Sequence, residues 1–318
     1  MPFTPIAPNE LNGSFDSNLL EKAEYVYISS VKLLGGHNQI VLDEIKKLLR
    51  ITNSYYSNRI ESEGTHPINI EQAMNKNFSS NSTEKKLQYL SIAHIKSQEL
   101  LEEMVFTQNI NPFDISFIKM IHKIFYEMDG MEEFLTIAHK EKQIKMSPGV
   151  FREDDVAVGE HIAVSYTQLQ NIMNKFCELY TQSISHGSKA QKLIYILSSH
   201  HRFVWIHPFL DGNGRVSRLL LDMLVHKIGI EGYGIWNLSR GLARNNTTYK
   251  KLLSLADEKK YNEYDGRGTL SKKELYTFVE FLLDSAIDQV DYMNKILNLS
   301  SLINRVENYV KNSNQNMY

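Results

Sequence analysis

The stretch 207–218, His207-Pro208-Phe209-Leu210-Asp211-Gly212-Asn213-Gly214-Arg215-Val216-Ser217-Arg218, predicts a turn between two helices. Apolar side chains before it recur at helical spacing, which indicates a helix that ends near Trp205. Pro208 prevents this helix from continuing, because the residue before a proline is disfavoured in the helical conformation. The apolar run Leu219-Leu220-Leu221 indicates the next helix. His207 is therefore expected on the turn between them.

Gly212, Asn213 and Gly214 favour a backbone that binds anions. Glycine and asparagine adopt positive φ at low cost and leave little side chain in the way. Successive N–H groups at the start of a helix point outward, and the helix dipole strengthens their attraction for phosphate. Arg215 and Arg218 both lie on the first turn of the second helix. Two guanidiniums beside such a loop predict a polyphosphate ligand.

Two further side chains complete the pattern of a phosphate-transfer site. Asp211 lies at the mouth of the loop, where one carboxylate could hold a Mg²⁺ ion completed by water and phosphate oxygens. His207 carries a side chain suited to removing a proton at neutral pH. A calcium-binding loop is excluded, because its twelfth position would carry Arg218 or Leu220 in place of glutamate.

Outside this stretch the chain predicts an all-α bundle with one hairpin. A proline-containing arm comes first, then a helical pattern from Leu19 that Gly35-Gly36 interrupts. A helix over about 40–61 follows, which Gly64 and Pro67 are expected to end, and 75–82 predicts a loop. Further helices are expected over 84–106, 112–128, 166–180, 189–205, 212–228, 245–257 and 272–310, with a polar tail after residue 312.

The hairpin is expected at about 147–159. Val150-Phe151 and Val156-Ala157-Val158 are the candidate strands, and they flank the charged residues 152–155. Ser147-Pro148-Gly149 precedes them as a turn signal.

Composition bounds the class of protein. The chain has 318 residues, of which 42% are hydrophobic and 23% charged, so it can bury a large core. The net charge of -2 gives no basic field that would recruit nucleic acid or a membrane surface. The single cysteine, Cys177, excludes an internal disulfide, and the first residues show no signal peptide. We therefore expect a cytoplasmic protein without a membrane or nucleic-acid partner.

Residues 207–218 resemble, without departure, the signature of the Fic (filamentation induced by cAMP) family. Weaker likenesses to the same family are found at His200, Phe203, 147–152, 244–249 and 265–270. The resemblance covers about 40–285 and implies an all-α Fic-type bundle with a short β-hairpin flap and additional N- and C-terminal helices. The implied parts are an N-terminal helical region (1–90) with an inhibitory helix at about 40–64, a Fic core (91–270), and C-terminal helices with a polar tail (271–318).

The family resemblance also implies an activity. A protein adenylyltransferase would use ATP and Mg²⁺ and transfer AMP to a Ser, Thr or Tyr hydroxyl of a protein, itself included. His207 would be the general base and Asp211 the Mg²⁺ ligand. The nucleotide would be bound by Gly212, Asn213, Gly214, Arg215 and Arg218. The flap would hold the target peptide in an extended form through Gly149, Val150, Phe151, Val156, Ala157 and Val158.

Relatives of this kind carry an inhibitory helix with Ser or Thr, three residues, Glu, and then Gly or Asn. Ser57 and Glu61 fit, although Ser62 stands where Gly or Asn is usual; Glu63-Gly64 fits the last two positions instead. The resemblance favours Glu61, which would pair with Arg218 and displace the γ-phosphate of ATP. In some relatives the same glutamate helps to remove AMP, so de-AMPylation stays open.

Alternatives of two other kinds remain at this stage. A Fic-type enzyme could transfer phosphate or another nucleotide, but the phosphate-transferring relatives tend to carry Lys where Gly214 stands. A non-catalytic nucleotide-sensing regulator or toxin–antitoxin protein would be expected to lose His207, Asp211 or Arg215, and all three are present. The sequence leaves open the target protein, the acceptor residue, the nucleotide preference and whether the chain forms a homo-oligomer.

Overall fold

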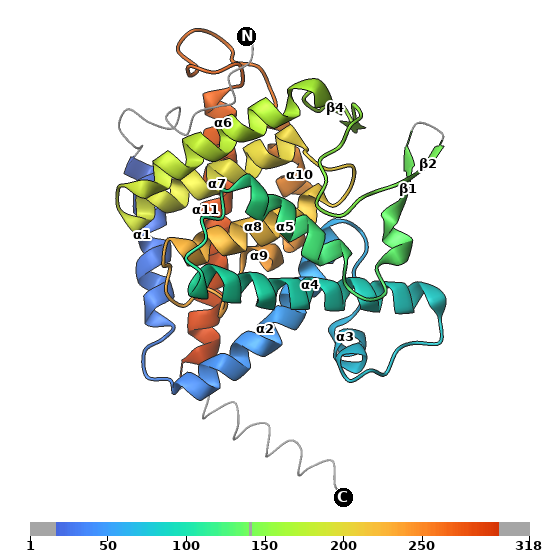
Figure 1. Cartoon of the computed structure of the whole chain (residues 1–318). Helices are drawn as coiled ribbons and strands as arrows, with labels where there is room; N and C mark the ends of the chain where they lie inside the picture. Colours follow the sequence, from blue (N-terminus) through green and yellow to red (C-terminus); the bar gives the residue numbers. More distant parts are fainter. Residues whose placement is uncertain (1–16, 140–141, 299–318) are drawn as a thin grey trace, which may run out of the picture.

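The computed structural model describes residues 17–139 and 142–298. These residues form eleven α helices and two small antiparallel sheets (Figure 1). The helices are α1 (Ser17–Lys32), α2 (Gln39–Ile60), α3 (Pro67–Met74), α4 (Ser82–Thr107), α5 (Ile115–Tyr126), α6 (Tyr166–Ser185), α7 (Lys189–Ile206), α8 (Asn213–Lys227), α9 (Leu238–Arg244), α10 (Asn246–Leu255) and α11 (Lys272–Leu297). A short 3-10 helix, η2 (Glu132–Leu135), precedes the first sheet. The all-α prediction is confirmed.

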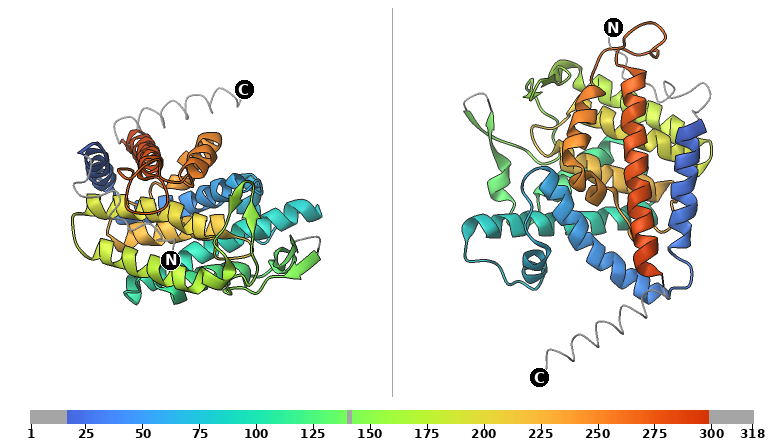
Figure 2. Two further views of the ribbon diagram at one scale, coloured as in Figure 1. Left: turned by 90° about the horizontal axis from the view of Figure 1, so that it is seen from above. Right: turned by 180° about the vertical axis from the view of Figure 1, so that it is seen from behind.

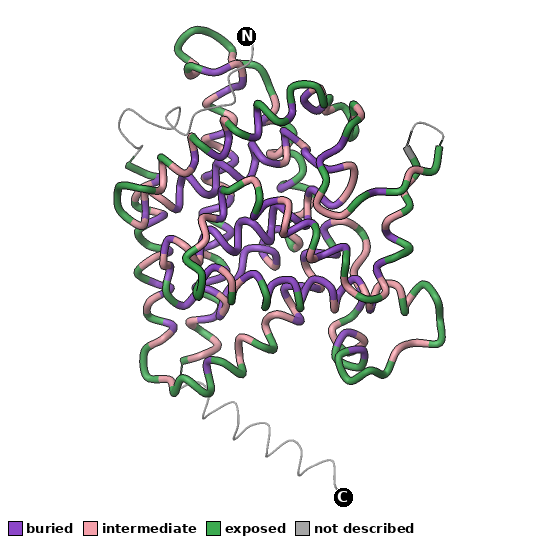
Figure 3. Tube along the Cα trace, in the orientation of Figure 1, coloured by how far each residue is buried: buried purple, intermediate pink, exposed green. Residues whose placement is uncertain are grey.

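Helices α7 and α8 form the centre of the bundle. Figure 3 shows both as largely buried, and α8 contacts α2, α4, α5 and α7. Its apolar residues point in all directions, as expected of a helix enclosed by others. Leu219, Leu220 and Leu221 are each at most 2% exposed, and burying one leucine side chain contributes about 1.5–3 kcal/mol. The start of α7 is fixed by a capping box between Ser188 and Gln191.

The terminal helices cover one side of this centre. Helices α1 and α11 run side by side (Figure 2), and α2 packs against α4 and α9. One continuous apolar core includes side chains from α1 and α11 as well as from α7 and α8. Helix α4 runs unbroken across residue 90, where the first two expected parts of the chain meet. The described helices therefore pack as one body.

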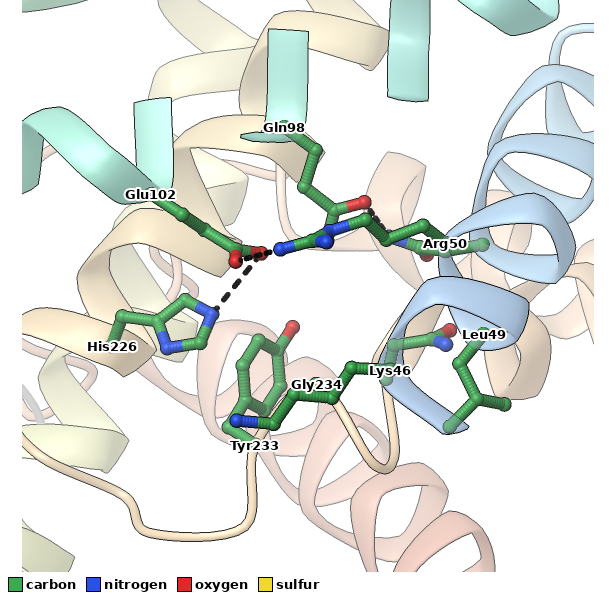
Figure 4. A pocket seen from close by; sticks show the side chains of 10 residues that line it. Lys46, Leu49, Arg50, Gln98, Glu102, His226, Tyr233 and Gly234 are labelled. Atoms are coloured by element: carbon green, nitrogen blue, oxygen red, sulfur yellow. Dashed lines mark hydrogen bonds and ion pairs between the residues drawn. The ribbon is translucent and has the colours of Figure 1, made fainter. Parts of the chain in front are cut away.

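Buried polar contacts fix α2 to the bundle. Arg50 of α2 donates to Glu102 of α4 at 2.6 Å, and Glu102 also faces His226 of α8 at 3.5 Å (Figure 4). These three side chains line a cavity of about 10 Å³. One turn further along α2, Asn53 donates to the buried Asp222 carboxylate of α8 at 3.2 Å. Helix α2 is thus part of the core.

Two helices were not expected from the sequence. Pro67 was expected to end a helix, but it is the first residue of α3, where its missing N–H costs nothing. The short α9 lies in a segment for which no element was expected, and its N-cap is Asn237. The expected helix over 272–310 is found as α11 to Leu297. The expected polar tail, the N-terminal arm and residues 299–310 lie outside the described residues.

The hairpin expected at 147–159 is correct only in its second strand, since 156–158 overlaps an observed strand and Val150-Phe151 does not form one. The strands are β1 (Thr136–His139) with β2 (Lys142–Lys145), and β3 (Ala157–Val158) with β4 (His161–Ile162). Val150 and Phe151 form no strand and do not pair with 156–158. The physical reason is Arg152, whose buried guanidinium binds main-chain oxygens and holds 150–155 as a loop. Arg152, although charged, therefore does not lie at a solvent-exposed turn.

Candidate active site

The turn after α7 has the backbone of an anion-binding loop. His207 is left-handed, with φ 54° and ψ 62°, and its N–H donates to Phe203 at 3.1 Å. Asn213 closes the loop with its side chain, accepting from Phe209 N–H at 2.9 Å and donating to Phe209 C=O at 2.8 Å. Only the backbone N–H of Asn213 is therefore left to face a phosphate.

Position 212 favours glycine for two reasons, its backbone conformation and the lack of space for a side chain. It begins α8 with φ 78°, a region that L-residues with a side chain adopt at a cost of about 1–2 kcal/mol. A Cβ at this position would lie 2.5 Å from the hydroxyl oxygen of Tyr126. The loop therefore closes against the end of α5.

The His207 ring has a defined tautomer. Its Nδ1 lies 3.3 Å from the carbonyl oxygen of Val204, which can only accept, so Nδ1 carries the hydrogen. Nε2 is then left with a lone pair. Burial, with smaller contributions from the nearby His161 and Arg152, lowers the pKa of His207 to about 4. The imidazole is neutral at physiological pH and can accept a proton at Nε2.

Arg152 connects the flap loop to this turn. Its Nε donates to the His207 carbonyl oxygen at 2.7 Å, and its backbone N–H donates to Pro208 at 3.0 Å. Nη1 donates to the main-chain carbonyl oxygen of Asp154 at 2.7 Å, and Nη2 donates to the main-chain carbonyl oxygen of Val164. One buried side chain thus fixes the loop before β3 and the segment after β4 against the turn that follows α7.

Asp211 and Arg215 meet at Tyr126. The Tyr126 hydroxyl donates to Asp211 Oδ2 at 3.2 Å and accepts from Arg215 Nη1 at 3.2 Å. Burial raises the pKa of Asp211, and the Glu61 carboxylate adds to the rise. A cation at this carboxylate would offset the burial of its charge.

The residues present fit a Mg²⁺ ion. Mg²⁺ usually takes one or two protein carboxylates, with phosphate oxygens and waters as its other ligands. Asp211 alone meets that requirement at the mouth of the phosphate loop. Within the described residues, no group of three or more His, Cys, Asp or Glu side chains forms a ready-made metal site. The donor set therefore matches a metal that arrives with a nucleotide.

Arg218 is held by the end of α2. Its Nε donates to Ser57 Oγ at 2.9 Å, and Nη2 donates to the Ser57 carbonyl at 2.9 Å. Nη2 also forms an ion pair with Glu61 Oε1 at 2.7 Å. Burial alone would raise the pKa of Glu61, but the charges of Arg218 and Arg215 outweigh it and lower this pKa. Glu61 is thus ionised, and it occupies the arginine that was expected to bind the γ-phosphate.

A second carboxylate holds the other arginine. Glu63 forms an ion pair with Arg215, which is 4% exposed in its side chain. The sequence treated Glu61 and Glu63 as alternatives, yet both contact the loop, one arginine each. The two guanidiniums of the predicted polyphosphate site are therefore both paired with carboxylates from the end of α2.

The turn between these glutamates explains the departure at Ser62. Ser62 N–H donates to Arg59 and Glu63 N–H donates to Asn58, each at 3.0 Å, which is the Schellman pattern at a helix end. This pattern needs a left-handed residue, and Ser62 has φ 65°. Gly or Asn meets that need at lower cost, which accounts for the usual residues at this position.

Replacing Ser62 by glycine is expected to stabilise the protein. Glycine removes the left-handed cost of about 1–2 kcal/mol, and its greater freedom in the unfolded chain takes back part of the gain. We expect the free energy of unfolding to rise by about 0.5–1 kcal/mol, seen as a higher urea midpoint with an unchanged slope. Ser80→Gly is the matched control, since Ser80 is exposed and has negative φ, and it should not stabilise. A lower midpoint for Ser62→Gly would contradict this reading.

Gly214 lies directly beneath Glu61. A Cβ on Gly214 would collide with Glu61 Oε1. The absence of a side chain at 214 is therefore what lets Glu61 approach the start of α8. The same space would serve a phosphate oxygen if the glutamate moved away.

The structure brings most of the predicted site residues together. His207, the loop 211–214, both arginines, Ser57 and Glu61 surround one region at the start of α8. The predicted flap residues differ in their exposure to solvent. Val150 and Val158 are exposed beside the turn, whereas Phe151 is buried against Phe209, with ring centroids 5.3 Å apart. Phe151 therefore supports the loop and does not face solvent.

Several residues contact the turn although no pattern in the sequence predicts that they lie there. Tyr126 and His122 come from α5, more than eighty residues before the turn, and reach it only through the fold. Arg152 lies within the predicted flap segment, and its sequence neighbours indicate no role for it. His161 and Asp257 contact each other at 3.1 Å beside α7, although they are far apart in sequence.

Known proteins resemble this chain in sequence and in fold. Residues 112–225 match the sequence profile of the Fic/DOC family. A stretch of 81 residues is 40% identical to the Protein adenylyltransferase Fic of Drosophila ananassae and 41% identical to that of Drosophila melanogaster. That stretch is 26% of this chain, and it spans only 16% of the length of each relative.

The likeness in fold is more extensive. A Fic domain-containing signalling protein from Bacteroides thetaiotaomicron has a TM-score of 0.65 at 19% identity, over 87% of this chain and 97% of the other. A fragment of Fic-1 from C. elegans has a TM-score of 0.66 at 13% identity, over 89% of this chain and 74% of the other. At these identities the likeness speaks for the fold.

Proposed function

Because residues 112–225 of this chain form a Fic domain, we propose that the protein is a protein adenylyltransferase that transfers AMP from ATP to a protein hydroxyl. The observation that carries the proposal is the neutral His207 beside a loop whose arginines, carboxylate and backbone N–H groups suit a metal-bound triphosphate. The likeness to proteins named Protein adenylyltransferase Fic supports it further.

The chemistry follows from the positions of these groups. Nε2 of His207 removes the proton of the acceptor hydroxyl while its oxygen attacks the α-phosphorus of ATP. The bond to the leaving pyrophosphate breaks, and the backbone N–H groups of 212–214 bind the phosphate oxygens. Arg215 and Arg218 offset the charge that develops on the leaving group. Positioning and charge supply most of the rate in such a reaction.

Asp211 is the residue that would hold Mg²⁺. When bound, the ion supplies positive charge to the phosphate oxygens and orients them. Tyr126 keeps the Asp211 carboxylate and the Arg215 guanidinium in register by bonding to both. The tyrosine therefore acts by positioning these two groups.

The end of α2 would restrain the activity from within the chain. Glu61 and Glu63 pair with Arg218 and Arg215, so a triphosphate must displace both carboxylates before it reaches the arginines. Inhibition by Glu61 is then intramolecular, and Ser57 keeps Arg218 in place for it. We include de-AMPylation by the same site as an open part of the proposal.

Transfer of phosphate is the second candidate, but Gly214 speaks against it. A lysine there would place a side chain where Glu61 now lies. Among the helices in 17–139 and 142–298, none is long and apolar enough to cross a membrane. We propose the cytoplasm as the site of action, with a protein partner that is yet to be named and self-modification as an activity.

The experiment is the intact mass of the purified protein after incubation with ATP and Mg²⁺. The Glu61→Gly variant is expected to gain one AMP unit or more, and the unchanged chain less. Addition of a phosphate unit in place of AMP would favour the second candidate. No mass increase in either protein, with ATP and then with the other nucleoside triphosphates, would contradict self-modification as an activity. Glu71→Gly serves as control, because Glu71 is an exposed helical glutamate away from the turn.

A further inference from the structure

His161 lies between three parts of the site. It is the first residue of β4, and its ring fits between the end of α7 and Asp257, the second residue after α10. Nδ1 lies 3.1 Å from Asp257 Oδ2, and Nε2 lies 2.9 Å from the Trp205 carbonyl oxygen. Trp205 is two residues before His207. The ring therefore joins the hairpin of β3 and β4 to the helix that ends in the catalytic turn.

The two partners of His161 determine its protonation state. A carbonyl oxygen only accepts hydrogen bonds, and so does an ionised carboxylate. Each ring nitrogen must then carry a hydrogen, which makes the ring an imidazolium cation. Asp257 is ionised, since its pKa lies at about 2: burial raises it, but the bonds from His161 and His201 lower it by more.

The neighbouring charged groups agree with this assignment. His201 also contacts Asp257, at 3.0 Å, but its Nδ1 faces Arg202 Nη1 at 2.7 Å and so accepts a hydrogen bond. Burial, and then the charge of Arg202, lower the pKa of His201 to about 4, so His201 is neutral. Arg152 and His207 are the other titratable groups near the His161 ring. His161 is thus the cation that Asp257 pairs with.

The β3–β4 hairpin has little other than the contacts of His161 with Asp257 and Trp205 to hold it in place. It has only two residue pairs, Ala157 with Ile162 and Val158 with His161, and so short a ribbon is not stable by itself. Ile162 and Val158 are 79% and 53% exposed, so little apolar burial supports it. Arg152 secures the segments before and after the hairpin, whereas His161 secures the strand itself.

We propose that His161, as an imidazolium ion held by Asp257 and Trp205, is the positioning residue that fixes the β3–β4 hairpin beside the catalytic turn so that it can seat the protein target. The inference deepens the proposed function, because the hairpin matters for transfer only if a protein hydroxyl must be placed at His207. The contact itself is independent of that function.

The proposal has a defined pH dependence. Burial tends to lower the pKa of His161, but Asp257 and the Trp205 carbonyl raise it by more, so the net pKa lies above its usual range. A raised pKa in the folded state means that the anchoring is complete at low pH and is lost as the pH rises through that pKa. The hairpin is therefore expected to loosen on the alkaline side. His207 would still be a neutral base there, with its pKa of about 4.

The test combines two measurements that need no activity. NMR titration of the imidazole signals should give His161 a pKa above about 6.5, the usual histidine value, and this pKa should fall in Asp257→Asn. Amide hydrogen exchange at pH 7 should be at least tenfold faster at 157–162 in His161→Gln, with the amides of α8 unchanged as an internal check on folding. His186→Gln is the matched control, because His186 is an exposed histidine at the end of α6.

AMP transfer in a Glu61→Gly background completes the test. The rate should decline as the pH rises past the measured pKa of His161, and His161→Gln should be slow at pH 7 and lack that decline. A His161 pKa at or below about 6.5, or equal exchange at 157–162 in variant and parent, overturns the proposal. Absence of AMP transfer from every variant, with the titration and exchange results as expected, would contradict the proposed function and leave the anchoring contact standing.

Discussion

His207→Ala is expected to lower the rate of AMP transfer by about 10²–10⁴-fold, the usual contribution of a general base. The variant removes the Nε2 lone pair but leaves the loop 211–214, Arg215 and Arg218 in place. Nucleotide binding should therefore be unchanged. The structural role of residue 207 is carried by its backbone, which is left-handed and bonds to Phe203 and Arg152 through main-chain atoms.

The measurement is incorporation of labelled AMP, with ATP affinity measured by calorimetry, both in a Glu61→Gly background. His186→Ala, at an exposed histidine, should behave like the parent. In the parent, kcat/KM should not fall on the acid side until the pH approaches about 4, the pKa of His207 in the free protein. Retained transfer in His207→Ala would remove His207 from its role, and lost ATP binding would show that the variant damages the loop instead.

Glu61→Gly is expected to raise AMP transfer by roughly tenfold or more, since even 1.4 kcal/mol of lost competition corresponds to a factor of ten. The change removes the carboxylate that pairs with Arg218 and opens the space above Gly214. Residue 61 is the C-cap of α2, so a glycine there does not interrupt a helix. The fold should therefore be retained, as a single cooperative thermal transition would show.

The second carboxylate makes this prediction sharper. With Glu61 removed, Glu63 still pairs with Arg215, so Glu61→Gly with Glu63→Gln should exceed Glu61→Gly alone. Glu63→Gln by itself should lower the KM for ATP less than Glu61→Gly does, because Arg218 stays paired. Equal transfer by the unchanged chain and all three variants would contradict inhibition by the end of α2. Glu71→Gln controls for the loss of a surface charge.

The sequence was most informative where one short stretch carried all the geometry. The exit of α7, the left-handed Gly212 and the start of α8 follow from Pro208, the glycines and the apolar run after them. The pairing of Arg218 with Glu61 was expected from the resemblance, and Arg218 Nη2 lies 2.7 Å from Glu61 Oε1. Local chemistry was sufficient for the turn itself, because its residues act within a few positions of one another, whereas the Arg218–Glu61 pair joins residues 157 positions apart and followed from the resemblance alone.

The rest depended on contacts that no local pattern encodes. Arg152 is charged, and a charged residue between two valine-containing segments favours a surface turn, yet its guanidinium is buried on main-chain oxygens. Tyr126 belongs to an amphipathic helix, and nothing in that helix shows that its hydroxyl bridges Asp211 and Arg215. The position of Glu63 depends on the left-handed turn at Ser62, which serine rarely adopts.

The burial of α2 has a consequence for how quickly the proposed enzyme would respond. Its last turns carry Asn53, Ser54, Ser57 and Asn58, all of them enclosed by the bundle, so the helix cannot leave without unfolding part of the core. Access to the arginines must then come from rotation of two glutamate side chains, a smaller motion than the domain movements that take microseconds to milliseconds. The proportion of molecules that bind ATP through both arginines would follow the ATP concentration directly, without a slow conformational step.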